Sequence, residues 1–284
     1  MYLAAATRPD IAFAVNKAGR VMDRPTENDW NNVKRIFRYL RSTSNYDLRY
    51  TRGPGELKVF SDADFAGDKV TRRSTTGVTA VVTNGAVSWA SQLQKMTALS
   101  TTEAEIIAAS EGAKELVWLK RLLSELLSDF AEKTPVLYID NASAIKLTKN
   151  PEYHKRSKDI EVRHFYVRER YLNDDIGIEH VDGRKQLADL LTKPIEHIRF
   201  EALCRETGIT SGKQRGDLCN VYCDGVLEEV IRLKHSTLDK CRARPVCVCI
   251  LLRSEGWTLL CLSRSSCSVP NHFTKLFSTL STIT

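Results

Sequence analysis

The chain has 284 residues, 42% of them hydrophobic and 27% charged, a balance that is typical of globular proteins. Its longest apolar runs, residues 246–252 and 257–262, are too short to span a bilayer, and no signal peptide follows Met1, so a membrane-spanning protein is disfavoured. The formal net charge of +7 suits a polyanionic partner, although many basic proteins bind no nucleic acid.

The eight cysteines all lie at or after Cys204, which leaves residues 1–203 without a disulfide or a thiolate ligand and fits a reducing compartment. Residues 210–284 hold seven of the eight, and no convincing hydrophobic period continues there. The pair Cys219 and Cys223 raises a zinc hypothesis, but the spacing to the later Cys and His residues fits no tight site. We therefore expect residues 210–284 to be an irregular, disordered extension.

Residues 1–50 predict two helices. Pro9 favours a helix start before residues 11–22, because proline is preferred in the first turn of a helix. A second helical pattern follows, in which Trp30 and Phe37 share one face. Two helices with one apolar stripe each are too small for a complete domain, so we expect this segment to be a helical remnant of a larger unit.

Residues 51–209 alternate strand and helix patterns. Asn84-Gly85 is a strong hairpin signal between two of the strands. Three meandering strands followed by alternating helices and strands predict a mixed sheet of the α/β class. The predicted strands are residues 57–62, 75–83, 86–92, 136–140 and 176–181; the predicted helices are residues 100–127, 141–148, 160–173 and a last one that opens at 186–191; residues 52–55 are a predicted turn.

Two aspartates lie where predicted strands end. Asp62 ends the strand at 57–62, and Asp140 ends the buried strand at 136–140, so both carboxylates are expected at one edge of the sheet. The alternatives are a simple acidic turn around Asp62 and a helix cap at Asp140.

Two further acids come from helical segments. Glu105 shares a helix face with small and apolar residues that suit packing on a sheet, whereas Glu103 lies about 200° around the helix and is expected in solvent. Either acid is also favoured by the helix dipole alone, since both lie near the first turn. Asp189 lies in an apolar turn, where its charge needs either a metal ion or a buried Lys or Arg partner. Four such converging carboxylates can hold divalent metal, and two metals can activate water for attack on a phosphodiester.

Four motifs, in their order and spacing, resemble the ribonuclease H domain of copia-type retrotransposon Pol polyproteins. The resemblance covers about residues 1–209. The segments that carry it are residues 60–68 (FSDADFAGD), 99–105 (LSTTEAE), 140–145 (DNASAI) and 186–193 (QLADLLTK).

The resemblance implies a ribonuclease H-like fold, in which a five-stranded mixed sheet is flanked by helices. It implies that four acids are catalytic and bind two Mg²⁺ ions, with Mn²⁺ as a substitute, in order to cleave the RNA strand of an RNA–DNA hybrid. These acids are Asp62, Glu105, Asp140 and Asp189.

The resemblance also divides the chain into three segments. Residues 1–50 are expected to be a helical remnant of the reverse transcriptase or connection region, residues 51–209 the ribonuclease H-like domain, and residues 210–284 an extension without a family counterpart. The expected partners are an RNA–DNA hybrid, the reverse transcriptase and the rest of the Pol polyprotein, with no membrane. The expected location is intracellular, either cytoplasmic in a virus-like particle or nuclear.

A basic cluster lies just before and within the predicted helix at 160–173. Neutralisation of phosphates by such a cluster gives sequence-tolerant affinity, which suits a nuclease that reads the shape of a hybrid. The alternative is a solvated helix face. His180 could shuttle protons near the acids, but a half-buried strand histidine is the preferred interpretation. The basic residues assigned to nucleic-acid binding are Lys155, Arg156, Lys158, Arg163 and Arg168.

Three functions are consistent with these features. The leading hypothesis is a metal-dependent endoribonuclease that acts during retrotransposon reverse transcription. The second is a catalytically inactive, nucleic-acid-binding relic of a retroelement polyprotein. Another nuclease or an integrase of the same fold is disfavoured, because all four motifs match one family.

Overall fold

The computed structural model describes residues 1–50, 56–126, 133–149, 158–212, 248–253 and 257–262, without the side chains of residues 126, 158–161, 248–253 and 257–262. The predicted turn at residues 52–55 lies outside these ranges. None of the described helices combines the length and the apolar content that crossing a bilayer would require.

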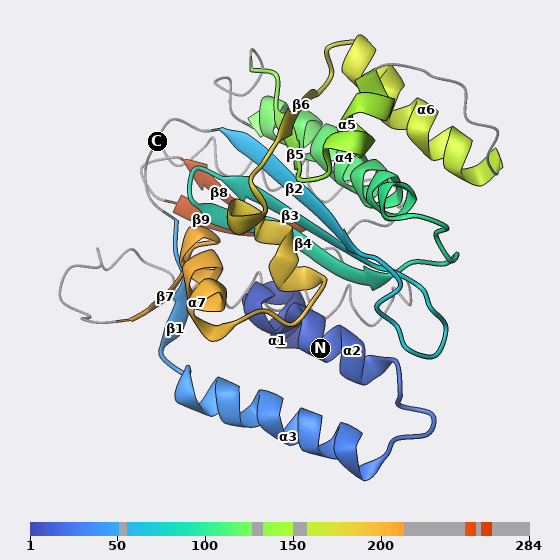
Figure 1. Ribbon diagram of the computed structural model, residues 1–284. Helices are drawn as coiled ribbons and strands as arrows, with labels where there is room; N and C mark the ends of the chain where they lie inside the picture. The colour runs from blue at the N-terminus through green and yellow to red at the C-terminus, as the bar shows by residue number, and fades with distance from the viewer. Residues whose placement is uncertain (51–55, 127–132, 150–157, 213–247, 254–256, 263–284) are drawn as a thin grey trace, which may run out of the picture.

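A five-stranded mixed sheet forms the centre of the fold, as the resemblance implied (Figure 1). Three antiparallel strands form a meander, and two further strands add in parallel at one side. The hairpin falls one residue earlier than the Asn84-Gly85 signal predicted: Thr83 and Asn84 form the turn, and Gly85 already pairs with Val82. In spatial order the strands are β4 (Gly85–Leu93), β3 (Thr75–Val82), β2 (Leu57–Asp64), β5 (Val136–Ile139) and β6 (Gly177–His180).

One face of this sheet is covered by the long helix α4 (Thr101–Leu126), flanked by α5 (Ala142–Lys149) and α6 (Lys158–Leu172) (Figure 1). The close approach of α4 to the sheet depends on Gly112, where an added Cβ would lie 2.9 Å from Leu137 Cδ1. The core on this side consists of Leu, Ile, Val and Ala side chains from both layers, because alternate residues of each strand face α4.

The opposite face is covered by shorter elements. The predicted helix at 11–22 is divided into a 3₁₀ turn, η1 (Pro9–Ile11), and the helix α2 (Ala12–Gly19). An unpredicted helix, α1 (Tyr2–Ala6), precedes them, and the indole Nε1 of Trp89 in β4 donates a 2.6 Å hydrogen bond to the carbonyl of Ala4. Further cover comes from the 3₁₀ helix η4 (Leu187–Leu191) and from α7 (His197–Glu206), and the short 3₁₀ helix η3 (Gly183–Lys185) precedes η4 without a buried residue.

A buried ion pair stabilises the N-terminal segment internally, and a small second sheet connects this segment to residues 209–211. Arg8 binds Asp10 at 2.7 Å and also donates to Thr43, at the end of α3 (Glu27–Ser42). The second sheet pairs β1 (Tyr46–Leu48) with β7 (Ile209–Ser211), two segments that are far apart in the chain.

The remaining described strands are β8 (Val248–Arg253) and β9 (Trp257–Leu262), which pair in antiparallel fashion. They correspond closely to the two apolar runs that are too short to span a bilayer.

Candidate functional site

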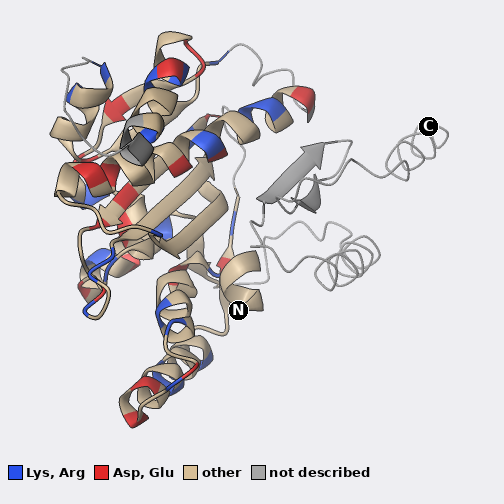
Figure 2. Cartoon of the chain, turned by 90° about the vertical axis from the view of Figure 1, so that its right-hand side faces the viewer, with Lys and Arg blue, Asp and Glu red and all other residues tan. Residues whose placement is uncertain are grey.

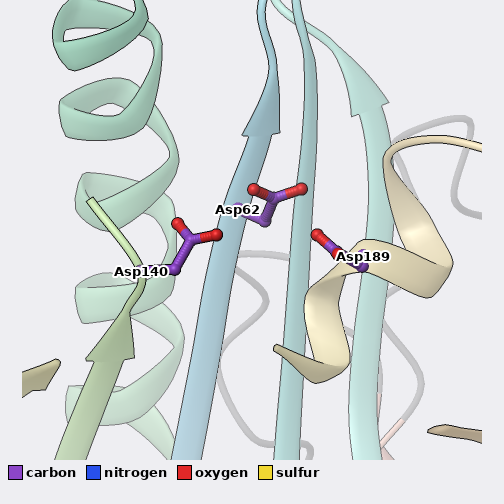
Figure 3. Close-up of side chains that lie close together, drawn as sticks. All are labelled: Asp62, Asp140 and Asp189. Carbon is purple, nitrogen blue, oxygen red and sulfur yellow. The ribbon is translucent and has the colours of Figure 1, made fainter. Parts of the chain in front are cut away.

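Asp62 and Asp140 lie side by side on two neighbouring parallel strands. Ser61 of β2 pairs with Ile139 of β5, so the next residue of each strand is an aspartate at the carboxyl end of the sheet. β2 continues to Asp64, two residues beyond the predicted strand end at Asp62. In Figure 3 the carboxylates of Asp62 and Asp140 lie next to each other.

Asp189 reaches the same place from the opposite layer. It lies in η4, a short 3₁₀ helix that ends at Leu191, whereas the sequence predicted the start of a longer helix. The buried side chain of Gln186 fixes this turn to the sheet by donating a 2.9 Å hydrogen bond to the Ser61 carbonyl. Gly77, the cross-strand partner of Asp62, lets η4 approach: an added Cβ there would lie 2.6 Å from the Ala188 carbonyl oxygen.

The three aspartates form a compact cluster. Asp62, Asp140 and Asp189 each offer a carboxylate oxygen, and these oxygens all lie within 4.8 Å of one another. Figure 3 shows that they converge from β2, from the end of β5 and from η4. The cluster adjoins an open cleft of about 520 Å³ that Asp62 and Asp140 line together with Glu105 and Lys193. Carboxylates at this spacing are compatible with a divalent metal ion.

Glu105 extends the acidic cluster from the α4 side. Its side chain is buried, and Oε2 has no hydrogen-bond partner among the described residues. Burial raises the pKa of Glu105 well above its usual range, and the negative charges of Asp62 and Asp140 raise it further. An unpartnered, buried carboxylate oxygen beside a cleft that two other carboxylates line is a pattern that a cation would complete.

The helix-face argument predicted Glu103 in solvent, and this prediction is wrong. Only 2% of Glu103 is exposed, because its carboxylate folds back over the helix start and accepts a 2.6 Å hydrogen bond from the Leu99 amide. The Ser100 hydroxyl accepts in turn from the Glu103 amide. This arrangement resembles a capping box, so Glu103 stabilises the start of α4 and is directed away from the cleft.

Two basic side chains neutralise part of the cluster. Lys193 Nζ lies 2.7 Å from Asp189 Oδ1 and 3.5 Å from Asp62 Oδ2, and Arg199 of α7 forms an ion pair with Asp189 Oδ2. The Thr192 hydroxyl donates to Asp62. Lys193 and Arg199 are thus the basic partners that the alternative to a metal ion at Asp189 required. Lys193 follows Asp189 by four residues, a common ion-pair spacing that could have revealed it, but no spacing indicated Arg199.

The pKa values in the cluster reflect burial and mutual repulsion. Burial raises the pKa of Asp189 to about 6, with a further rise from Asp62 and an opposing effect from Lys193. Burial also raises the pKa of Asp140, and Asp189 adds to that rise. Burial disfavours the charge of Lys193, but Asp62 and Asp189 outweigh this effect and raise the pKa of its ammonium group.

His180 is exposed at the end of β6 rather than half-buried. Its Nε2 lies 3.1 Å from the backbone carbonyl oxygen of Asp140, so the ring lies beside the acidic cluster. The strand pattern could not predict this exposure, because residue 180 lies at the rim of the sheet, where the alternation of buried and exposed residues ends.

The basic residues assigned to nucleic acid are only partly described. Lys155 and Arg156 lie outside the described residues, and Lys158 begins α6 with its side chain undescribed. Arg163 pairs with Glu111 of α4 at 2.8 Å, whereas Arg168 is half-buried on α6. Acidic and basic residues are interspersed along the helices in Figure 2. Nucleic-acid contact by these five residues therefore stays a prediction.

The fold and the acidic site together define the structural class of this protein. The central sheet is a three-stranded meander extended by two parallel strands, and acids from β2, the end of β5, α4 and η4 lie at one edge of it. This arrangement is a ribonuclease H-like α/β fold with a candidate metal centre.

The chain is similar to known retrotransposon Pol polyproteins. It is 45% identical over 206 residues to the retrovirus-related Pol polyprotein from transposon TNT 1-94 of Nicotiana tabacum, a match that covers 72% of this chain and 15% of the relative. It is 36% identical over 204 residues to the retrovirus-related Pol polyprotein from transposon RE2 of Arabidopsis thaliana, a match that covers 72% of this chain and 14% of the relative. The homologues of this chain are thus copia-type retrotransposon Pol polyproteins, and the chain spans about 15% of their length.

No family model matches the chain. Among solved structures, it resembles LC11-RNase H1 isolated from compost with a TM-score of 0.37 and 14% identity, over 48% of this chain and 92% of that protein.

Proposed function

We propose that the chain is a metal-dependent endoribonuclease of the ribonuclease H type, which cleaves the RNA strand of RNA–DNA hybrids during retrotransposon reverse transcription. The observation that carries the proposal is the convergence of three carboxylate oxygens within 4.8 Å, with a fourth acid, Glu105, at the same cleft. Homology to Pol polyproteins supports the same role.

The charges at the site fit a divalent cation. When all four carboxylates are ionised they contribute four negative charges, and Lys193 and Arg199 contribute two positive charges, so two negative charges remain for a cation to neutralise. Burial is the main cause of the raised pKa values of Glu105, Asp140 and Asp189, and the negative charges of neighbouring carboxylates add to it. Hard oxygen ligands of this kind favour Mg²⁺ or Mn²⁺.

Asp62, Glu105, Asp140 and Asp189 are the proposed ligands of two such ions. When bound, the ions would supply activation of the attacking water and stabilisation of charge on the leaving oxygen.

The remaining residues hold this constellation in place. Gln186 ties η4 to the Ser61 carbonyl, and Arg199 holds one oxygen of Asp189, so the orientation of Asp189 is fixed from behind. The backbone of β2 fixes Asp62, and Thr192 restrains its carboxylate through a hydrogen bond. A preorganised acidic cluster of this kind avoids the cost of reorganisation at the time of reaction.

The partners and the location belong to the same proposal. The substrate is an RNA–DNA hybrid, contacted by Lys155, Arg156, Lys158, Arg163 and Arg168, and the reverse transcriptase and the rest of the Pol polyprotein are further partners. Residues 1–50 belong to the end of the reverse transcriptase region, residues 51–209 to the nuclease domain, and residues 210–284 to an extension of unassigned role. The compartment is cytoplasmic, within a virus-like particle, or nuclear.

The test is the cleavage of three labelled substrates with the same sequence: an RNA–DNA hybrid, duplex DNA and duplex RNA. We expect RNA-strand cleavage of the hybrid alone, dependent on Mg²⁺ or Mn²⁺ and abolished by EDTA. Equal cleavage of duplex DNA would instead indicate another nuclease of this fold.

A binding-only relic is the second candidate, and the ion pairs of Asp189 with Lys193 and Arg199 favour it, since they already compensate one carboxylate. It predicts hybrid binding that shifts the mobility of the hybrid, with no cleavage under any metal condition.

A further inference from the structure

The ammonium group of Lys193 lies where a metal ion would need to bind. Its Nζ is 2.7 Å from Asp189 Oδ1 and 3.5 Å from Asp62 Oδ2, two carboxylates that the proposed function assigns to metal. The side chain is 35% exposed and lines the open cleft beside Asp62, Glu105 and Asp140. The ammonium group of Lys193 and a divalent cation in the cleft would therefore compete for the same carboxylate oxygens of Asp62 and Asp189.

Arg199 differs from Lys193 in this respect. Its guanidinium contacts the other oxygen of Asp189 and the backbone carbonyl of Gly183, and it is not among the residues that line the cleft. A planar guanidinium with two fixed acceptors is held in one orientation, whereas a lysine carries a compact charge on a flexible four-carbon stem. Arg199 can remain in place when the cleft is filled, and Lys193 can move away.

We propose that Lys193 is an internal competitor for the metal: its ammonium bridges Asp62 and Asp189, lowers the affinity of the site for divalent cations, and is displaced when a cation binds. The inference rests on the proposed metal site. Every cation that binds must then supply the free energy of breaking the two ion pairs in addition to its own coordination. Lys193 thus sets the metal concentration at which the site fills, without being a ligand itself.

The test is isothermal titration of the full chain with MnCl₂. Lys193→Met keeps the length of the side chain and removes its charge, so we expect Mn²⁺ to bind about tenfold more tightly, equivalent to about 1.4 kcal/mol. Lys193→Arg keeps the charge and should bind Mn²⁺ no more tightly than the wild type. Lys34→Met, on helix α3, lowers the net charge by the same amount and controls for long-range electrostatics.

The direction of the effect separates competition from damage, because a purely structural role of Lys193 would make metal binding weaker when the residue is replaced. Tighter binding by Lys193→Met alone supports the inference. Unchanged or weaker binding by Lys193→Met, or equally tighter binding by Lys34→Met, overturns it while the metal site stands. Absence of Mn²⁺ binding in the wild type and in both methionine variants overturns the proposed site and the inference together.

Discussion

Substitution of Gly77 links the packing of the fold to the geometry of the site. A Cβ added to Gly77 would lie 2.6 Å from the Ala188 carbonyl oxygen and 2.7 Å from Thr192 Cγ2. Neither distance is tolerable for a carbon atom, and the carbonyl is backbone, so Gly77→Ala must push η4 away from β3. Overpacking of this kind costs about 1–3 kcal/mol. The stabilisation of about 0.4–1 kcal/mol that Gly→Ala gives through the unfolded chain offsets only part of this cost.

The assay is urea unfolding, with Gly19→Ala as the matched control. Gly19 ends α2, and an added Cβ there meets no atom within 4 Å, so the control should be as stable as the wild type or slightly more stable. Gly77→Ala should unfold at a lower urea concentration with an unchanged slope. It should also bind Mn²⁺ more weakly, because η4 carries Asp189. A Gly77→Ala variant with the wild-type urea midpoint and the wild-type Mn²⁺ affinity would refute the role given to this contact.

Three further predictions follow from the described contacts. Glu103→Ala should lose about 1 kcal/mol of stability, because it removes the cap of α4. Glu105→Gln should weaken Mn²⁺ binding without loss of stability. Mn²⁺ titration and urea unfolding of both variants test these roles, and the reverse pattern would contradict the assignment of Glu103 to the cap and of Glu105 to the metal. Arg8→Met should cost about 3–5 kcal/mol, because it leaves the buried carboxylate of Asp10 without its cation; a loss below about 1 kcal/mol would show that the pair contributes little. Because the pKa of Asp189 is raised to about 6, the folded protein keeps a proton that the unfolded chain releases at about pH 4. The stability of the metal-free protein should therefore fall as the pH rises from about 4 to about 6, and its affinity for Mn²⁺ should rise over the same window. Urea unfolding and Mn²⁺ titration at each pH would check both trends. A Mn²⁺ affinity that does not change with pH in this window would exclude a protonation of Asp189 there.

The sheet and the two strand aspartates could be predicted from the sequence because they depend on local signals. The Asn84-Gly85 signal located the β3–β4 hairpin to within one residue, and the apolar runs before Asp62 and Asp140 placed both residues near the carboxyl ends of parallel strands. The ordered motifs then supplied the family, which the Pol polyprotein homologues confirm.

Contacts between distant segments could not be predicted in this way. Helix periodicity placed Glu103 in solvent, but a hydrogen bond to the backbone before the helix turns its side chain inward. The pairing of β1 with β7, and the approach of Arg199 to Asp189, join residues that no local period relates. The close approach of η4 to Gly77 likewise joins segments that the pattern around Asp189 does not relate.

The most direct test of the central claim is Mg²⁺-dependent cleavage of a labelled RNA–DNA hybrid by the wild type and by Asp140→Asn. The substitution keeps the size of the side chain and removes one of the three clustered carboxylates. We expect the wild type to cut the RNA strand and Asp140→Asn to leave it intact while the protein remains folded. Equal cleavage by both proteins, or cleavage that survives EDTA, would contradict the account.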